Sequence, residues 1–225
     1  MPARRDNLWG RRRGRPLSAH RAGLMADAYP ALGVDLSAPA DLAALFGKKP
    51  ETTILEIGFG GGEHLLAAAS AAPEKSFIGV EPFEEGRAKA VAGISEGKLA
   101  NVRLFDGDAA LLLDWLPEKS LDAVDLLYPD PWPKRRHWKR RFVSSENLGR
   151  LARALKSGGI FRFASDIPDY VAWTLRHVAA NADFVWTAER ATDWTEPYQN
   201  WQGTRYEAKA LREGRTPTYL EFSRR

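Results

Sequence analysis

From Thr52 to its end the chain alternates short apolar or β-branched runs with longer helical patterns. The runs predict seven strands, at residues 52–59, 76–81, 101–106, 121–128, 160–164, 184–189 and 218–222. The intervening patterns predict helices at residues 63–72, 84–94, 109–116, 142–156, 168–182 and 205–212. Gly158 and Gly159 are expected to end the helix at 142–156. Repeated βα units imply an α/β fold with a mostly parallel sheet, helices on both faces and ligands at the carboxyl ends of the strands.

The composition excludes several classes of site. None of the 225 residues is cysteine, so disulfides, thiolate zinc sites, iron-sulfur clusters and cysteine nucleophiles are ruled out. The four histidines are scattered, and no metal site is expected. The longest apolar run, at residues 65–72 and broken by Ser70, is far shorter than the roughly 18 residues of a membrane helix. We therefore expect a soluble, cytoplasmic protein without a membrane partner, and the sequence leaves monomer and homodimer open.

Basic residues gather in two places. Residues 1–21 hold seven arginines against one acid, and these residues belong to a predicted basic arm with a leading helix at 1–40 that precedes the main domain at 41–225. The second cluster consists of Lys134, Arg135, Arg136, Lys139, Arg140 and Arg141. Two such clusters on an otherwise acidic chain favour a nucleic-acid partner. The alternative is a solvated tail and a charged helix face. A targeting sequence is disfavoured because Gly10, Gly14 and Pro16 interrupt the arm.

A glycine-rich turn follows the first predicted strand. Its sequence is Glu56-Ile57-Gly58-Phe59-Gly60-Gly61-Gly62, and glycines there let a ligand approach the backbone closely. A dinucleotide-binding loop is disfavoured because Glu63 occupies the third glycine position, where its charge would crowd a pyrophosphate. The pattern E-x-G-x-G-x-G is instead typical of class I methyltransferases, whose ligand, S-adenosylmethionine, has no phosphate. Glu56 is then placed to interact with the cationic methionine moiety.

Two further acids follow the next two strands. Glu81 ends the second strand, where a carboxylate can accept both ribose hydroxyls. Asp108 follows the third strand and is placed to meet the adenine amino group. For Asp108 a helix cap is an equally good interpretation.

The fourth strand ends in the string Tyr128-Pro129-Asp130-Pro131-Trp132-Pro133-Lys134. Three prolines predict a stiff, extended turn that holds Asp130 in a fixed position. Amino-methyltransferases of this fold class carry an Asp or Asn with prolines and an aromatic here, and grasp a base by its edge. A purely structural turn is the alternative. Trp132 either stacks on a base or packs against the sheet.

Several motifs together resemble one family. They are Glu-Ile-Gly-Phe-Gly at 56–60, Pro-Asp-Pro-Trp-Pro-Lys at 129–134, Arg-His-Trp-Lys-Arg-Arg at 136–141, Ala-Ser-Asp at 164–166 and Thr-Arg-Tyr-Glu at 204–207. The combination is similar to the bacterial tRNA (guanine-N7-)-methyltransferases over essentially the whole chain, including an arginine-glycine leader at 9–15. The resemblance implies a Rossmann-like class I methyltransferase with a mostly parallel seven-stranded sheet.

The resemblance also implies an activity and a site. The activity is transfer of a methyl group from S-adenosylmethionine to N7 of guanine 46 in the variable loop of tRNA. The implied cofactor-binding residues are Glu56, Gly58, Gly60, Glu81, Asp108 and Asp130, and Asp130 is also the implied catalytic residue. The implied substrate contacts are Lys134, Asp166, Thr204, Arg205, Tyr206 and Glu207. The implied RNA-interacting residues are Arg136, His137, Trp138, Lys139, Arg140 and Arg141.

Several of these residues also fit a second interpretation. Thr204 and Glu207 also match a helix capping box, and Asp166 is placed to cap the helix at 168–182. A methyltransferase acting on an exocyclic amine would use Asp130 as proton acceptor. A non-enzymatic RNA-binding module is disfavoured by the intact glycine loop, and neither a hydrolase nucleophile elbow nor a metal-ligand cluster is present.

Overall fold

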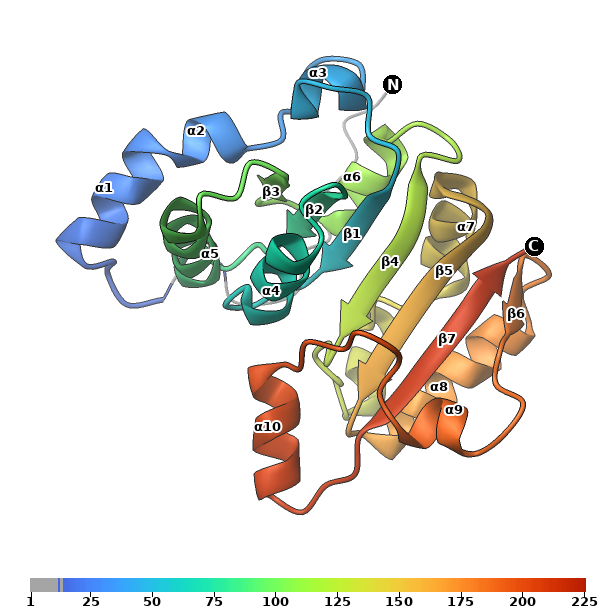
Figure 1. The fold of residues 1–225 in the computed structure, drawn as a ribbon. Coiled ribbons are helices and arrows are strands. Elements are labelled where there is room, and N and C mark those ends of the chain that lie inside the picture. The colour runs from blue at the N-terminus through green and yellow to red at the C-terminus, as the bar shows by residue number, and fades with distance from the viewer. Residues whose placement is uncertain (1–11, 13) are drawn as a thin grey trace. The chain divides into compact units, whose positions relative to one another are not determined.

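The computed structural model of the chain describes residue 12 and residues 14–225. Residues 1–11 and 13, which include most of the arginine-rich arm, lie outside the described residues. The chain divides into two compact units, Met1–Pro117 and Glu118–Arg225 (Figure 1). Within the described part of the chain, no helix has the length and apolarity needed to cross a membrane.

The first unit contains a parallel sheet with strand order β3-β2-β1. Its strands are β1 (Thr53–Ile57), β2 (Ser76–Val80) and β3 (Val102–Phe105). Its helices are α1 (Ala19–Asp27), α2 (Tyr29–Leu32), α3 (Leu42–Phe46), α4 (Glu63–Ala71), α5 (Glu84–Gly97) and α6 (Ala109–Trp115). Every residue of β2 is buried, as expected for the middle strand of a covered parallel sheet.

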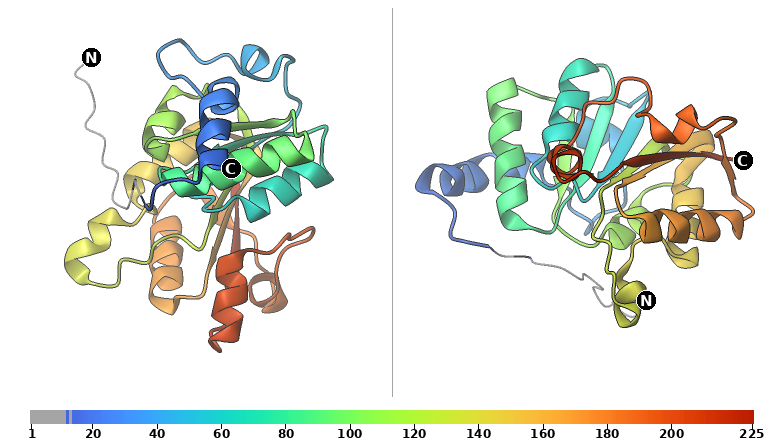
Figure 2. Two further views of the ribbon diagram at one scale, coloured as in Figure 1. Left: turned by 90° about the vertical axis from the view of Figure 1, so that its left-hand side faces the viewer. Right: turned by 90° about the horizontal axis from the view of Figure 1, so that it is seen from below.

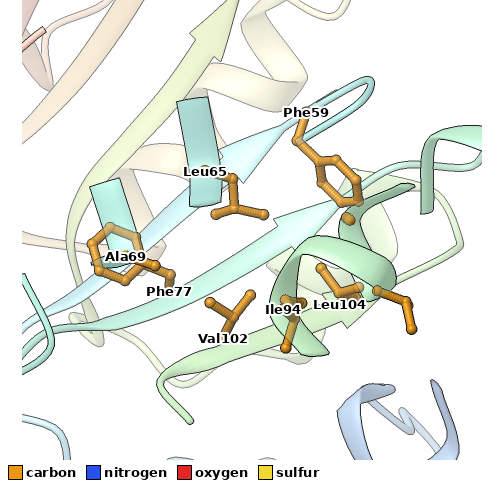
Figure 3. Packing of buried hydrophobic residues seen from close by; sticks show 9 residues of the cluster. Phe59, Leu65, Ala69, Phe77, Ile94, Val102 and Leu104 are labelled. Carbon is orange, nitrogen blue, oxygen red and sulfur yellow. The ribbon is translucent and has the colours of Figure 1, made fainter. Parts of the chain in front are cut away.

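A hydrophobic cluster holds this unit together. Figure 3 shows side chains from the loop after β1, from α4, β2 and β3, and from α5 pointing toward one another. Leu65 and Leu104 have no exposed surface, and Phe59 of the glycine turn is 4% exposed. Through Phe59, the cluster therefore anchors the start of that turn.

The segment before β1 also packs on the first unit. Helix α1 lies against α5, as Figure 2 shows, and its Leu24 and Met25 pack against the hydrophobic cluster. The Val34 amide donates to the Leu104 carbonyl of β3 at 2.9 Å. Sequence reasoning anticipated one leading helix and missed α2 and α3, which have four and five residues.

The second unit contains strands in the order β4-β5-β7-β6. These strands are β4 (Leu121–Leu127), β5 (Leu155–Ser165), β6 (Phe184–Trp186) and β7 (Thr218–Arg224). The helices are α7 (Ser145–Ala154), α8 (Pro168–Ala179), α9 (Thr192–Thr195), α10 (Arg205–Arg212) and the 3₁₀ helix η1 (Arg135–Arg140). β4 and β5 are parallel, whereas β7 is antiparallel to both β5 and β6.

Seven mostly parallel strands confirm the predicted fold class, but one helix end was predicted wrongly. Helix α7 ends at Ala154, and the chain enters β5 at once, so Gly158 and Gly159 do not end the helix. The pairing with β4 shifts there, because Leu121 pairs with Leu155 whereas Ala123 pairs with Ile160. Gly158 has a φ of +77°, and a Cβ on Gly159 would lie 2.9 Å from a carbonyl oxygen. Glycine is thus required by an irregular strand start, which sequence alone does not distinguish from a helix end.

Candidate functional site

The glycine turn after β1 adopts a conformation that needs glycine. Gly58, Gly60 and Gly62 have φ values of +75°, +59° and +85°. The Gly58 amide donates to the Val80 carbonyl of β2 at 2.7 Å, which sets the turn across the ends of two strands. A Cβ on Gly58 would meet nothing within 4 Å. The backbone is therefore open to a closely approaching ligand on that side.

Glu81 fixes this turn. Its carboxylate accepts hydrogen bonds from the Gly60 amide at 2.8 Å and from the Phe83 amide at 2.9 Å, and the residue is 9% exposed. Each oxygen of a carboxylate can accept more than one hydrogen bond, so these contacts leave room for ribose hydroxyls. The ribose contact itself stays a prediction.

Gly86, in the first turn of α5, is a site residue that sequence reasoning missed. A Cβ at this position would lie 2.3 Å from the Gly60 carbonyl oxygen and 3.1 Å from the Glu81 side chain. Glycine therefore lets the helix approach the turn. The available signal was a glycine inside a helical pattern, which usually has a packing reason.

Glu56 lies near the end of β1, where the sequence predicted it, but with an unforeseen partner. Its Oε2 is 2.8 Å from Nδ1 of His64 in the first turn of α4, and both side chains are buried. Sequence reasoning considered His64 only as a possible metal ligand. The described residues contain no group of three or more metal-ligating side chains.

Asp108 caps α6. Its side chain accepts a hydrogen bond from the Ala110 amide at 2.9 Å, and the residue is partly exposed. The cap interpretation is therefore confirmed, whereas contact with an adenine stays a prediction.

The turn at Pro129–Lys134 is strained rather than extended throughout. Tyr128 and Trp132 have φ values of +50° and +43°, and each precedes a proline. Such values are uncommon for residues other than glycine and persist only where the surroundings enforce them. The Asp130 side chain lies between these two positions, exposed, with no hydrogen bond in the described part of the chain.

The electrostatic setting of Asp130 is unusual for an exposed carboxyl. The residue reaches the surface, but its carboxyl is partly shielded from water. This loss of water raises the pKa of the Asp130 carboxyl above its ordinary value. Such a group is suited to a ligand that supplies hydrogen-bond donors or positive charge.

Trp132 packs on the basic run that follows it. The Arg140 guanidinium lies 4.8 Å from the Trp132 ring centroid, and the His137 ring meets Trp132 edge-on at 5.9 Å. Trp132 is half-buried.

The side chains of the basic run at residues 134–141 differ in their exposure to solvent. Lys134, Arg135, Arg136 and Lys139 are exposed. Arg141, in contrast, has a fully buried side chain, which departs from the predicted role in RNA contact. Loss of water and the neighbouring cations, Arg140 foremost, hold the pKa of His137 below its ordinary value. The exposed part of this segment is therefore a concentrated positive surface.

Asp166 does not cap α8. The cap position is Ile167, and Asp166 instead accepts a hydrogen bond from Arg215 at 2.5 Å. Its side chain is only 11% exposed. The cap interpretation is wrong because the chain continues one residue further before the helix begins, and no sequence pattern identified Arg215 as the partner.

At residues 204–207, the Thr204 side chain makes its hydrogen bond of the predicted capping box, but the Glu207 side chain does not. Thr204 Oγ1 accepts a hydrogen bond from the Glu207 amide at 3.0 Å, but the Glu207 carboxylate turns inward. There it accepts hydrogen bonds from Trp201 at 2.8 Å and from the Tyr219 hydroxyl. Arg205 and Tyr206 are exposed, with the guanidinium 4.7 Å from the ring centroid.

Sequence comparison finds full-length relatives. Residues 50–220 match a family model described as a putative methyltransferase. A curated protein of Brucella melitensis, named tRNA (guanine-N(7)-)-methyltransferase, is 55% identical to this chain. The match covers 97% of this chain and 95% of the relative. The corresponding protein of Azorhizobium caulinodans is 57% identical over 96% of this chain and 94% of the relative.

Solved structures share the fold at low identity. The 16S rRNA methyltransferase KamB matches with a TM-score of 0.56 and 16% identity, covering 84% of this chain and 95% of that chain. The aminoglycoside resistance methyltransferase NpmB1 matches with a TM-score of 0.54 and 19% identity, covering 79% of this chain and 89% of that chain.

Gly86→Ala is expected to lower the free energy of unfolding by about 1–3 kcal/mol, because the new methyl group collides with a backbone oxygen that cannot rotate away. Gly93→Ala, on the same helix, is the matched control. Its Cβ would meet only the end of the Leu66 side chain, which can move. Thermal or urea unfolding measures both, and equal losses would contradict a specific contact between α5 and the turn.

Asp130→Asn is expected to raise the melting temperature near neutral pH. A carboxyl whose pKa is raised in the folded state stabilises the protein only while protonated, and this stability is lost as pH rises through the folded pKa. The gain should vanish near pH 4, around the ordinary pKa of about 3.9.

Asp35→Asn is the control of opposite sign. Hydrogen bonds from Ser37 lower the pKa of Asp35, so that variant should melt earlier at neutral pH, and the loss should shrink on acidification. Melting curves from pH 4 to 8 test both, and the same sign for both variants would contradict the assignment.

Proposed function

Because the chain belongs to the bacterial tRNA (guanine-N7-)-methyltransferase family, we propose that it transfers a methyl group from S-adenosylmethionine to N7 of a guanine in tRNA. We propose guanine 46 of the variable loop as the target. The observation that carries this proposal is 55% identity to a curated enzyme of that name over 97% of the chain.

The first unit contains residues that fit the proposed cofactor. The open side of Gly58 offers bare backbone, and Glu81 ties the turn in place. The surrounding strand ends carry the acids Glu56, Glu81 and Asp108, which suit the hydroxyls, amino groups and positive charge of S-adenosylmethionine and not a phosphate. When bound, S-adenosylmethionine supplies an electrophilic methyl group.

His64 extends this set of residues. Its ring nitrogen contacts the Glu56 carboxylate, so the carboxylate is held in one orientation at the end of β1. A carboxylate fixed in this way orients a cationic ligand without rearrangement, which lowers the cost of binding.

Asp130 of the second unit suits a guanine acceptor. Guanine N7 is an unprotonated in-plane lone pair, so attack on a methyl group requires no proton removal and no strong base. The product purine gains positive charge. The Asp130 carboxylate can stabilise that charge, or accept hydrogen bonds from the N1–H and N2–H edge of the base, because no described protein group occupies it. The strained turn would supply the alignment.

The second unit also offers surfaces for RNA. The exposed cations Lys134, Arg136 and Lys139 are proposed to contact phosphates, together with the neighbouring His137, Trp138 and Arg140. Thr204, Arg205 and Tyr206 are proposed substrate contacts at the start of α10. The carboxylates of Asp166 and Glu207 are engaged inside the protein, so we propose that they shape this region.

Product analysis tests the function directly. The protein is incubated with methyl-labelled S-adenosylmethionine and an unmodified tRNA transcript, the RNA is digested, and the labelled nucleoside is identified by mass spectrometry. We expect 7-methylguanosine, and no label in a transcript with adenine at position 46. A label on an exocyclic amine would contradict the proposed atom, and label retained in the altered transcript would contradict the proposed position.

Asp130→Asn is expected to keep measurable activity, whereas Asp130→Ala should lose about 10²–10³-fold in the rate of methyl transfer. The amide oxygen of asparagine still accepts a hydrogen bond from the base, but alanine offers no acceptor. Single-turnover rates at saturating tRNA and cofactor measure both variants. Equal losses would contradict binding of the base through its edge.

Arg136→Ala and Lys139→Ala should weaken tRNA binding and each reduce the slope of log K against log salt by about 1. Arg190→Ala is the control, because its side chain is 81% exposed but lies outside the basic run. Filter binding between 50 and 300 mM salt measures the slopes. An unchanged slope in the first two variants would show that the basic run is only a solvated surface.

A further inference from the structure

The side chain of Arg141 is enclosed by aromatic rings although it ends the most basic segment of the second unit. It has no exposed surface. Its guanidinium carbon lies 5.3 Å from the ring centroid of Trp138 and 4.9 Å from those of Tyr170 and Trp173. A planar, weakly hydrated guanidinium suits such a site, whereas a lysine ammonium does not. Arg141 is therefore held from within the protein.

The polar contacts of Arg141 connect two segments. Its Nε donates to the Pro131 carbonyl at 2.9 Å, and a terminal nitrogen donates to the carboxylate of Asp169 in the first turn of α8. Val143, two residues after Arg141, accepts a hydrogen bond at its carbonyl from Nε1 of Trp173 in α8, at 2.7 Å. The segment after η1 is thus fastened to α8, and Pro131 is fastened to that segment.

Pro131 immediately follows Asp130, and its turn is difficult to hold. Three of its residues are prolines, which have no amide hydrogen to donate. Tyr128 and Trp132 are in the left-handed region, an unfavourable conformation for residues other than glycine that needs support from the surroundings. The Arg141 bond to the Pro131 carbonyl provides such support one residue from the carboxylate.

We propose that Arg141, anchored by Asp169, is a positioning residue that fixes the Pro129–Lys134 turn and with it the Asp130 carboxylate. In this role it differs from its exposed neighbours, which are proposed to contact phosphates. The inference rests on the proposed function, since it assigns Arg141 to the rate of methyl transfer and not to affinity for tRNA.

Two variants test this role. Arg141→Lys keeps the positive charge but loses the planar guanidinium group that donates to both Pro131 and Asp169. Asp169→Asn weakens the anchor at a residue whose side chain is 55% exposed. The matched control is Glu146→Gln, because Glu146 is also an exposed carboxylate bound to a buried arginine, Arg150, at 2.6 Å on α7. Circular dichroism establishes whether each variant folds. If Arg141→Lys does not fold, Asp169→Asn alone tests the proposal.

The expected result separates rate from affinity. At saturating tRNA, kcat should fall about 10–100-fold in Arg141→Lys and about 3–10-fold in Asp169→Asn, because small misplacements of an aligning group are costly. The dissociation constant for tRNA should stay within about twofold of wild type, with an unchanged salt slope, as for a group without phosphate contacts. The control should match wild type in both. Amide hydrogen exchange should accelerate in peptides covering residues 130–141 and not elsewhere.

Other outcomes would overturn the proposal. Wild-type kcat in both variants, or a reduced salt slope with lost tRNA affinity in Arg141→Lys, would show that Arg141 does not position the turn. If the wild-type protein methylated a different atom, the proposed function would fail, and the exchange measurement would still decide whether Arg141 anchors residues 130–141.

Discussion

The two hydrogen bonds that Glu81 accepts from backbone amides are the contact on which the candidate cofactor site depends. The bond from Gly60 joins the end of β2 to the glycine turn after β1, and the bond from Phe83 holds the carboxylate in place. The absence of a Cβ at Gly86 lets α5 close over the same turn. A conformation with three left-handed glycines is entropically costly to fix, so an anchor is needed. An acid that sequence reasoning assigns to a ligand therefore also shapes the ligand's site.

The fold followed from sequence because its signals are periodic and repeated. Alternation of strand and helix patterns predicted all seven strands, and α10 was predicted at its observed bounds. The errors lie where one residue type serves two purposes. Gly158 and Gly159 signal both a helix end and an irregular strand, and only the pairing of β5 with β4 distinguishes them.

The site was predictable where local sequence determines it. The glycine turn, the cap at Asp108 and the Thr204 half of the capping box lie where the motifs placed them. Long-range partners were not predictable, because the contacts of Asp166 with Arg215 and of Glu207 with Tyr219 join residues that no spacing rule connects. A single sequence reveals which side chains are charged, but the fold decides which charges meet solvent.

The basic run shows the physical basis of that limit. A 3₁₀ helix has three residues per turn, so side chains three apart lie on one face. Arg135, Trp138 and Arg141 share such a face, and both guanidiniums lie over the Trp138 ring. His137 and Arg140 share a second face and meet Trp132, which leaves Arg136 and Lys139 on the third. Chemically similar arginines of one short segment thus have different surroundings, with Arg141 buried among aromatic rings and Arg136 exposed to solvent.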